Sequence, residues 1–286
     1  MKTTKIENRI TYFMITLGVF LLNIKNFSFF SLIFGFLLSL LFILLFQKLN
    51  IRKFKITKLI LLIISIIMMI LSINQISYFI SDNMLREYSV ITISITLLLS
   101  IIILGNKGYH TIIKVILLAA YFVFFITIFG LLLNFPYVNL SNLSLNLLKT
   151  NNLFKETFYY TFLITYSYFL IYPISNTKFK IKDLIVSSSY QILLYLLIIS
   201  ILGFTLTNLY EYPYITIFKK VNLIDFVERV EILFSLNYLF NFYFFLLLCY
   251  YQIRNILENK IIKDKNLKTA LILITLLVFL TSILIF

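Results

Sequence analysis

Apolar residues dominate this sequence in long continuous runs, and short polar or charged segments separate the runs. Each run approaches the roughly 20 residues that an α-helix needs to cross a bilayer. Apolar and polar residues do not alternate within the runs, which argues against the strands of a membrane barrel. We predict an all-α polytopic membrane protein with about nine transmembrane helices in one integral membrane domain, residues 1–286. The helices are predicted near 10–22, 28–46, 59–80, 89–104, 111–133, 156–172, 184–207, 230–252 and 269–285.

Composition agrees with this pattern, because 61% of the 286 residues are hydrophobic and only 13% are charged. Soluble domains average roughly 45–50% apolar and about 25% charged residues. The first apolar run follows Lys2, Lys5 and Arg9 like a signal peptide, but no small-residue cleavage site follows it. We therefore predict that it is a retained first helix. The polar residues 23–26 mark either a tight turn before the second helix or a break within a longer first helix.

Charged residues assign an orientation to the predicted helices. With the N-terminus inside, 18 of the 25 lysine and arginine residues fall in inner loops, whereas 7 of the 11 acidic residues fall outside. The whole net charge of +14 then lies on the inner face, as expected for short cytoplasmic loops. Anionic membrane lipid accounts for these cations, so no nucleic-acid partner is predicted.

Residues for catalysis or metal binding are sparse. The one histidine, His110, is predicted in an inner loop, and the one cysteine, Cys249, lies inside an apolar run. No His, Cys and carboxylate cluster has the spacing of a metal site, and no phosphate-binding glycine loop is present. We predict that the protein is not an enzyme and needs no cofactor or metal.

Polar side chains inside several predicted helices are candidates for a binding site at mid-membrane. Such residues either bind a small polar solute or hold helices together by hydrogen bonds, and the sequence leaves both open. Gly18 in the first helix either breaks the helix at a ligand site or permits close packing. The candidate ligand-binding residues are Thr16, Gly18, Asn74, Gln75, Thr165, Tyr166, Ser167, Asn237 and Asn241.

Four charges gather at the start of the eighth predicted helix: Asp225, Glu228, Arg229 and Glu231. Asp225 and Arg229 are four residues apart in the favourable order for a helical ion pair. Acidic residues in a first turn also suit the helix dipole. One interpretation is an amphipathic surface segment that caps this helix, preceded by a loop turn at 210–214.

The surrounding segment, YPYITIFKKVNLIDFVERVEILF, resembles the signature of the spore germination permease family, the B subunits of spore germinant receptors. The matching residues are Pro213, Phe226, Glu228, Arg229 and Glu231. Members combine a proline-containing loop, a short amphipathic helix and a Phe-x-Glu-Arg-x-Glu motif.

Two further segments are similar to the same family. GYHTIIK resembles its glycine and basic residue at the fifth helix, here Gly108 and Lys114. YFLIYPISNTKFKIKD resembles the end of its sixth helix and the basic loop that follows, with Pro173 and Lys178. Together the matches cover roughly residues 100–255, whereas the first hundred residues agree only in hydropathy.

The resemblance implies the inverted-repeat fold of the amino acid–polyamine–organocation transporters, here lacking the tenth helix. It implies a ligand, an amino acid or similar small solute, held between broken helices one and six and flanked by helices three and eight. Relatives carry a Gly-Glu pair midway along helix six, where this sequence has Leu163 and Ile164. We therefore expect either no recognition of amino acids or a shifted specificity.

The resemblance also implies partners and a location: a larger membrane receptor subunit and a lipoprotein subunit, in the spore inner membrane. Two other functions stay open. One is a secondary amino-acid transporter, and the other is an assembly or scaffold protein of the membrane that binds no ligand. A solute-sized cavity opposes the scaffold, and a narrow dry polar region favours it.

Overall fold

The computed structural model describes residues 5–48, 55–146, 152–175, 179–219, 231–260 and 264–285. All regular elements in these ranges are helices, as predicted. Every one of the nine predicted segments overlaps one long helix. These helices are α1 (Lys5–Asn23), α2 (Phe29–Lys48), α3 (Lys55–Asn83), α4 (Val90–Gly105), α5 (Tyr109–Asn134), α7 (Leu153–Ser175), α8 (Ile181–Leu209), α10 (Glu231–Lys260) and α11 (Asp264–Ile285).

Five helical segments of the described chain are long and apolar enough to cross a membrane. They are Phe29–Lys48, Ile56–Asn83, Tyr109–Tyr137, Ile181–Leu209 and Ile232–Glu258. Large apolar side chains cover the outer surface of the bundle, as with Leu118, which is 79% exposed. A lipid environment accepts such a surface, so the protein is an all-α membrane protein. The other predicted crossings and the inner position of the N-terminus stay predictions.

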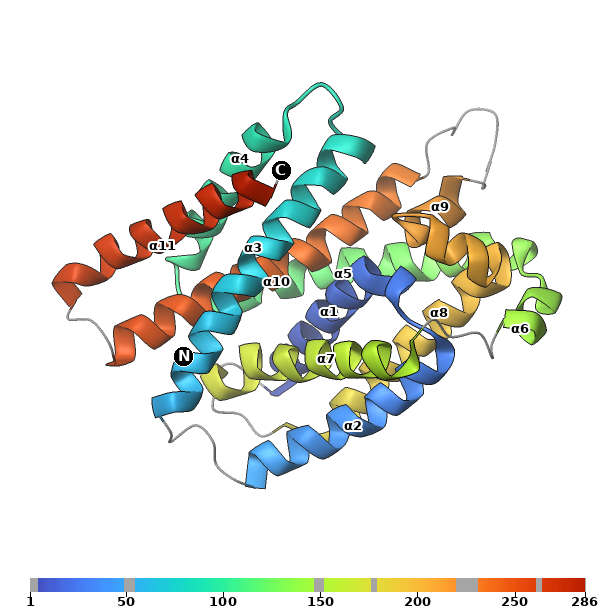
Figure 1. Ribbon diagram of the computed structural model, residues 1–286, viewed down its shortest axis with the longest axis horizontal. Coiled ribbons are helices and arrows are strands. Elements are labelled where there is room, and N and C mark those ends of the chain that lie inside the picture. The colour runs from blue at the N-terminus through green and yellow to red at the C-terminus, as the bar shows by residue number, and fades with distance from the viewer. Residues whose placement is uncertain are drawn as a thin grey trace.

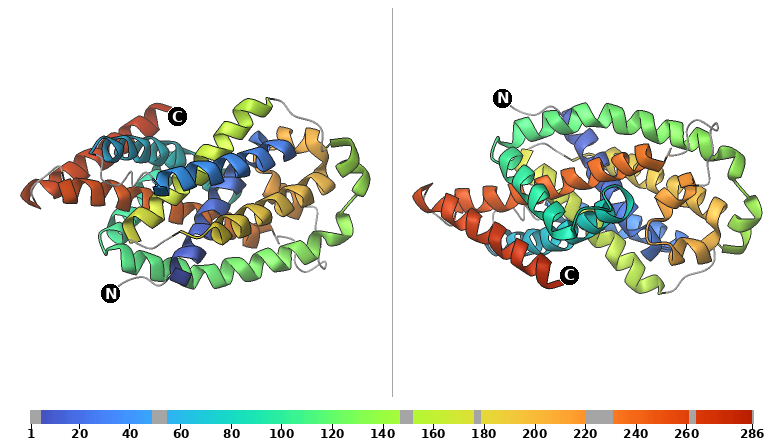
Figure 2. Two further views of the ribbon diagram at one scale, coloured as in Figure 1. Left: turned by 90° about the horizontal axis from the view of Figure 1, so that it is seen from below. Right: turned by 90° about the horizontal axis from the view of Figure 1, so that it is seen from above.

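Helix α1 lies at the centre of the bundle (Figures 1 and 2). It packs against α5, α7, α8 and α10, and α2 packs against both α7 and α8. On one side of the bundle α3, α4 and α11 form a group that joins the centre through α10 (Figure 1). The short helix α6 (Leu140–Asn146) lies on the opposite side and packs against α8.

Side-chain caps define where several helices begin. At the start of α7, the side-chain oxygen of Asn152 accepts the backbone N–H of Lys155 at 3.2 Å. In return, the Glu156 carboxylate accepts the backbone N–H of Asn152 at 3.1 Å. This reciprocal pair satisfies two N–H groups that the first helical turn leaves without a carbonyl partner. Ser89 caps α4 by accepting the N–H of Thr92.

Helix α8 contains a break that the sequence pattern did not predict. Gly203 has φ 76° and ψ 163°, a conformation that other residues rarely adopt. One turn earlier, the carbonyl of Ser200 accepts the backbone N–H of Asn139 at 3.1 Å and the side-chain amide of Asn142 at 3.0 Å. Asn139 and Asn142 therefore supply hydrogen-bond donors to a backbone carbonyl of α8 close to the break.

The structure corrects two predicted loops. The loop predicted at 210–214 ends early, because Pro213 begins α9 (Pro213–Lys219). Proline suits this first helical position, since its nitrogen has no hydrogen to leave unpaired. Five α9 residues are buried, so the helix packs into the bundle and is not a surface segment. His110, predicted in a loop, lies in the first turn of α5.

Candidate functional site

A pocket opens between α1, α3, α7 and α10, and we call it the α3–α7 pocket. Its volume is about 460 Å³. Small-molecule sites occupy roughly 300–1,000 Å³, so the size suits a small solute. The lining residues are Val19, Asn23, Ile64, Ile67, Met68, Leu71, Ser72, Gln75, Tyr159, Phe162, Phe242 and Phe245.

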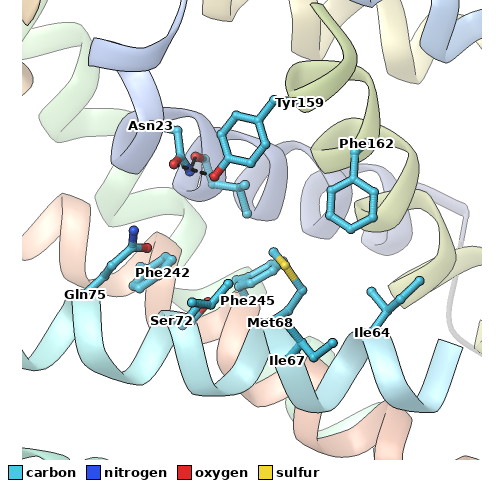
Figure 3. Close-up of a pocket in the computed structure, with 12 residues that line it drawn as sticks. Asn23, Ile64, Ile67, Met68, Ser72, Gln75, Tyr159, Phe162, Phe242 and Phe245 are labelled. Carbon is cyan, nitrogen blue, oxygen red and sulfur yellow. Dashed lines mark hydrogen bonds between the residues drawn. The ribbon is translucent and has the colours of Figure 1, made fainter. Parts of the chain in front are cut away.

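Helical spacing brings the lining residues of each helix onto one face. On α3, Met68, Ser72 and Gln75 follow one another at spacings of four and three residues. On α7, Tyr159 and Phe162 are three residues apart. In Figure 3, the side chains from α3 lie opposite those from α1 and α7, across the pocket.

The pocket has a polar end. There the hydroxyl of Tyr159 donates to the side-chain oxygen of Asn23 at 2.8 Å, and the amide of Asn23 donates to the carbonyl of Val19 at 2.8 Å. Ser72 and Gln75 face this pair from α3 (Figure 3). In the described chain, no hydrogen bond engages the exposed amide of Gln75. The Gln75 amide can therefore hydrogen-bond to a solute, whereas the side-chain oxygen and nitrogen of Asn23 already have partners in the protein.

The rest of the lining is apolar and aromatic, and none of its side chains is acidic or basic. A carboxylate or ammonium group in this pocket would lack a charged partner, and its desolvation would be costly. The arrangement suits an uncharged solute with an apolar or aromatic body. Within the described ranges, no group of three His, Cys, Asp or Glu side chains is placed to hold a metal ion.

A second polar region, the α1–α8 polar cluster, consists of Thr16, Tyr160, Ser187 and Gln191. The Tyr160 hydroxyl donates to the side-chain oxygen of Gln191 at 2.6 Å, and the Gln191 amide donates to the Ser187 hydroxyl at 3.3 Å. The hydroxyls of Ser187 and Thr16 are 2.5 Å apart. All four side chains are buried, and they bond α1, α7 and α8 to one another.

The α1–α8 polar cluster encloses no space for a ligand. Thr16 and Ser167, both predicted to bind ligand, line a small void that has no room for a water molecule. Leu163 and Ile164 add apolar walls to the same void. The hydroxyl of Thr16 is bonded to Ser187 of α8, and the hydroxyl of Ser167 donates to the carbonyl of Leu163 in its own helix.

Gly18 is a packing residue. Helix α1 is continuous from Lys5 to Asn23, so the break implied by the resemblance is absent there, and α7 is likewise continuous. A methyl group at Gly18 would lie 2.7 Å from the backbone carbon and oxygen of Asn241. The glycine thus allows the backbones of α1 and α10 to approach closely, as small residues do in membrane bundles.

Asn237 and Asn241 connect α10 to itself and to α9. The amide of Asn241 donates to the backbone and side-chain oxygens of Asn237, both at 2.8 Å. The amide of Asn237 donates to the Tyr214 hydroxyl at 3.1 Å. Both asparagines are buried and neither lines the α3–α7 pocket.

The remaining predicted ligand residues lie elsewhere in the core. The Tyr166 hydroxyl donates to Ser65 at 3.0 Å and lies 3.5 Å from the sulfur of Cys249. Thr165 and Asn74 are buried, and in the described chain the Thr165 hydroxyl and both Asn74 amide atoms have no hydrogen-bond partner. None of these three residues lines the pocket.

Of the nine predicted ligand residues, only Gln75 lines the α3–α7 pocket. The prediction selected polar side chains, whereas aromatic and aliphatic side chains make most of this pocket. Asn23 was missed because its segment was assigned to a turn. A usable signal was the spacing of Ser72 and Gln75 on a face that also carries Met68.

Family-signature positions are described in part. Gly108 precedes α5 with φ 94°, Lys114 is exposed on α5, and Pro213 begins α9. Pro173 lies two residues before the end of α7, and Glu231 is the first residue of α10. Outside the described residues lie Asp225, Glu228 and Arg229.

An ion pair that the sequence did not predict joins the starts of α1 and α8. The Arg9 guanidinium lies 2.8 Å from the Asp183 carboxylate. The Tyr172 hydroxyl donates to the same carboxylate at 3.0 Å, which adds the end of α7. Asp183 is nearly buried, so the pair with Arg9 compensates its desolvation.

We compared the sequence and the structure with known families, proteins and solved structures. The sequence matches no protein-family model, and neither curated proteins nor solved structures show a significant similarity to it.

Proposed function

We propose that the protein is a permease-like membrane subunit that binds a small solute in the α3–α7 pocket. The position of the pocket carries this proposal. The four helices around it, α1, α3, α7 and α10, are the first, third, sixth and eighth of the predicted segments. These are the helices that the resemblance to spore germination permeases assigns to the ligand.

Helix packing supports the permease-like part of the proposal. An inverted repeat would pair α1 with α7, α2 with α8, α3 with α10 and α4 with α11. Under this pairing, the contact of α2 with α7 corresponds to that of α8 with α1, and the contact of α4 with α10 corresponds to that of α11 with α3. Under the same pairing, the contact of α1 with α10 would correspond to a contact of α3 with α7. The α3–α7 pocket lies at this place, between α3 and α7.

The lining of the pocket narrows the class of solute. Its one ionisable side chain, Tyr159, already donates to Asn23. An uncharged solute with an apolar or aromatic body therefore fits better than a free amino acid. The resemblance further implies that the subunit works in the spore inner membrane with a larger membrane subunit and a lipoprotein.

A scaffold function is the second candidate. The closed α1–α8 polar cluster favours it, because this cluster holds helices together and leaves no room for a water molecule beside Thr16 and Ser167. A scaffold would stabilise a membrane complex and would show no selective response to solutes.

Thermal unfolding of the purified protein against a panel of amino acids, nucleosides, sugars and aromatic alcohols separates the two candidates. A solute at 100 times its dissociation constant should stabilise the folded state by about 2.7 kcal/mol. We expect selective stabilisation by uncharged solutes. No selective stabilisation across the panel would favour the scaffold.

Variants then test whether the stabilising solute occupies the pocket. Leu71→Trp fills the pocket from an exposed position on α3 and should abolish the stabilisation, whereas Leu99→Trp on the exposed face of α4 should retain it. Gln75→Leu should weaken solute binding, whereas its matched control Gln47→Leu, at an exposed position near the end of α2, should not. Equal stabilisation of the Leu71→Trp and Leu99→Trp variants would place the solute elsewhere.

A further inference from the structure

A groove on the outer surface of the bundle runs between α1, α5 and α8, and we call it the α1–α5 groove. Its volume is about 540 Å³. It is separate from the α3–α7 pocket and shares no lining residue with it. The lining residues are Arg9, Ile10, Phe13, Met14, Leu117, Ala120, Tyr121, Val123, Phe124, Lys182, Asp183 and Val186.

The three helices that form the groove begin at the same end of the bundle. The Tyr109 hydroxyl in the first turn of α5 donates to the side chain of Asn8 in α1 at 3.1 Å. The Arg9–Asp183 pair joins the starts of α1 and α8. The sequence predicts that this end faces the cytoplasm, where anionic lipids concentrate.

Positive charge gathers at this end of the groove. Lys182 is exposed, and no described acidic residue forms an ion pair with it. Lys114 is also exposed, one helical turn before Leu117 on α5. Arg9 is paired with Asp183, yet its side chain keeps 37% of its surface exposed. An anion at this end would meet Lys182 and the accessible guanidinium of Arg9, which shares its charge with Asp183, while Lys114 lies just beyond the lining.

The other end of the groove is apolar and open to the membrane. Met14 and Val186 continue the groove away from the charged end, and the small side chain of Ala120 leaves room in its floor. Tyr121 and Phe124 border it with exposed fractions of 78% and 60%. From Leu117 to Phe124 the α5 wall is about 10 Å long, enough for the upper part of an acyl chain.

We propose that the α1–α5 groove binds an anionic phospholipid. The phosphate lies beside Lys182 and Arg9, and one acyl chain follows α5 toward Phe124. An amphiphile with charge at one end matches a groove with cations at one end and apolar walls beyond. An apolar transmembrane helix of another protein would offer no anion to Lys182 and Arg9, whereas a phospholipid supplies a phosphate there.

Native mass spectrometry of the purified full chain tests this proposal in mixed micelles that contain equal amounts of phosphatidylglycerol and phosphatidylcholine. We expect the protein to retain phosphatidylglycerol in preference to phosphatidylcholine. One lysine beside an anionic headgroup is worth about a fivefold change in affinity. Lys182→Gln should therefore lower phosphatidylglycerol retention about fivefold, whereas Lys48→Gln, at the exposed end of α2, should not change it.

A second pair of variants tests the apolar part of the groove. Ala120→Phe fills the groove and should displace the lipid, whereas Leu118→Phe on the exposed face of the same helix should not. Unfolding temperatures of all four variants report whether the fold is intact. Equal retention of both lipids, or equal effects of Lys182→Gln and Lys48→Gln, would overturn the proposal. Displacement of lipid by a co-purifying membrane protein would overturn it too.

Discussion

The α1–α8 polar cluster and the α3–α7 pocket use one face of α1, because Thr16, Val19 and Asn23 follow at spacings of three and four residues. Val19 lines both the pocket and the small void beside the cluster. The cluster is rich in hydroxyl and amide groups, yet it is closed. The pocket is mostly aromatic and aliphatic, yet it holds about 460 Å³ of space. The region with the most polar side chains therefore has no room for a ligand, and the region with room for a ligand is mostly apolar.

The contrast teaches how to interpret polar residues in an apolar bundle. Without water, polar side chains in neighbouring helices satisfy one another, and this draws the helices together. Aromatic rings have rigid shapes, so a wall of Phe162, Phe242 and Phe245 leaves space beside it. A polar face in a membrane helix predicts a helix contact at least as well as a binding site.

We expect the largest loss of stability from a change at Gly18, where α1 packs closely against α10. Gly18→Val places new atoms against the backbone of Asn241 and should separate α1 from α10. Overpacking of this kind typically costs about 1–3 kcal/mol, and we expect the upper end because the clash is with backbone. The measurement is the free energy of unfolding in detergent. Ser189→Val, on an exposed face of α8, is the control and should change it by less than about 0.5 kcal/mol.

The wall between the two regions provides the second test. Val19→Ala removes the side chain that borders both spaces and should join the small void to the pocket. The lost packing should lower the free energy of unfolding by about 1–2 kcal/mol. Solutes with one extra methyl group should then bind more tightly than to the wild-type protein. Unchanged preference for solute size would mean that the void stays closed.

The third and smallest effect isolates the polar cluster. Tyr160→Phe removes the hydroxyl that donates to Gln191 and should lower the free energy of unfolding by about 1 kcal/mol. Solute binding should be unchanged, because Tyr160 does not line the pocket. Tyr137→Phe, at an exposed hydroxyl, is the matched control. A loss of solute binding in Tyr160→Phe alone would mean that the cluster belongs to the binding site.

Hydropathy was sufficient to predict the long helices. Each predicted segment overlaps one helix, because a bilayer requires long apolar runs and a backbone that satisfies its own hydrogen bonds. The turn between α4 and α5 contains Gly108, whose positive φ is a conformation that glycine adopts readily. Helix α6 and the break at Gly203 were not predicted, because both depend on contacts between distant segments.

The candidate site was much harder to predict. Sequence alone does not show which helices adjoin, so it could not reveal that Asn23 and Tyr159 meet across 136 residues. Nor could it distinguish Gly18 as a break from Gly18 as a close contact, because only the position of Asn241 decides that. Polar residues were good indicators of buried contacts and poor indicators of the pocket.

The central position of α1 has a consequence for synthesis. Helix α1 leaves the ribosome before the helices that it contacts, and the partners of its polar groups follow late: Ser187 follows Thr16 by 171 residues. At a translation rate of about 5–20 residues per second, Ser187 is synthesised roughly 10–30 s after Thr16. During this interval Arg9, Thr16 and Asn23 of the newly synthesised α1 lack their partners in α7 and α8. The early translation product therefore depends on the insertion machinery or on lipid headgroups to hold it until the second half of the chain arrives.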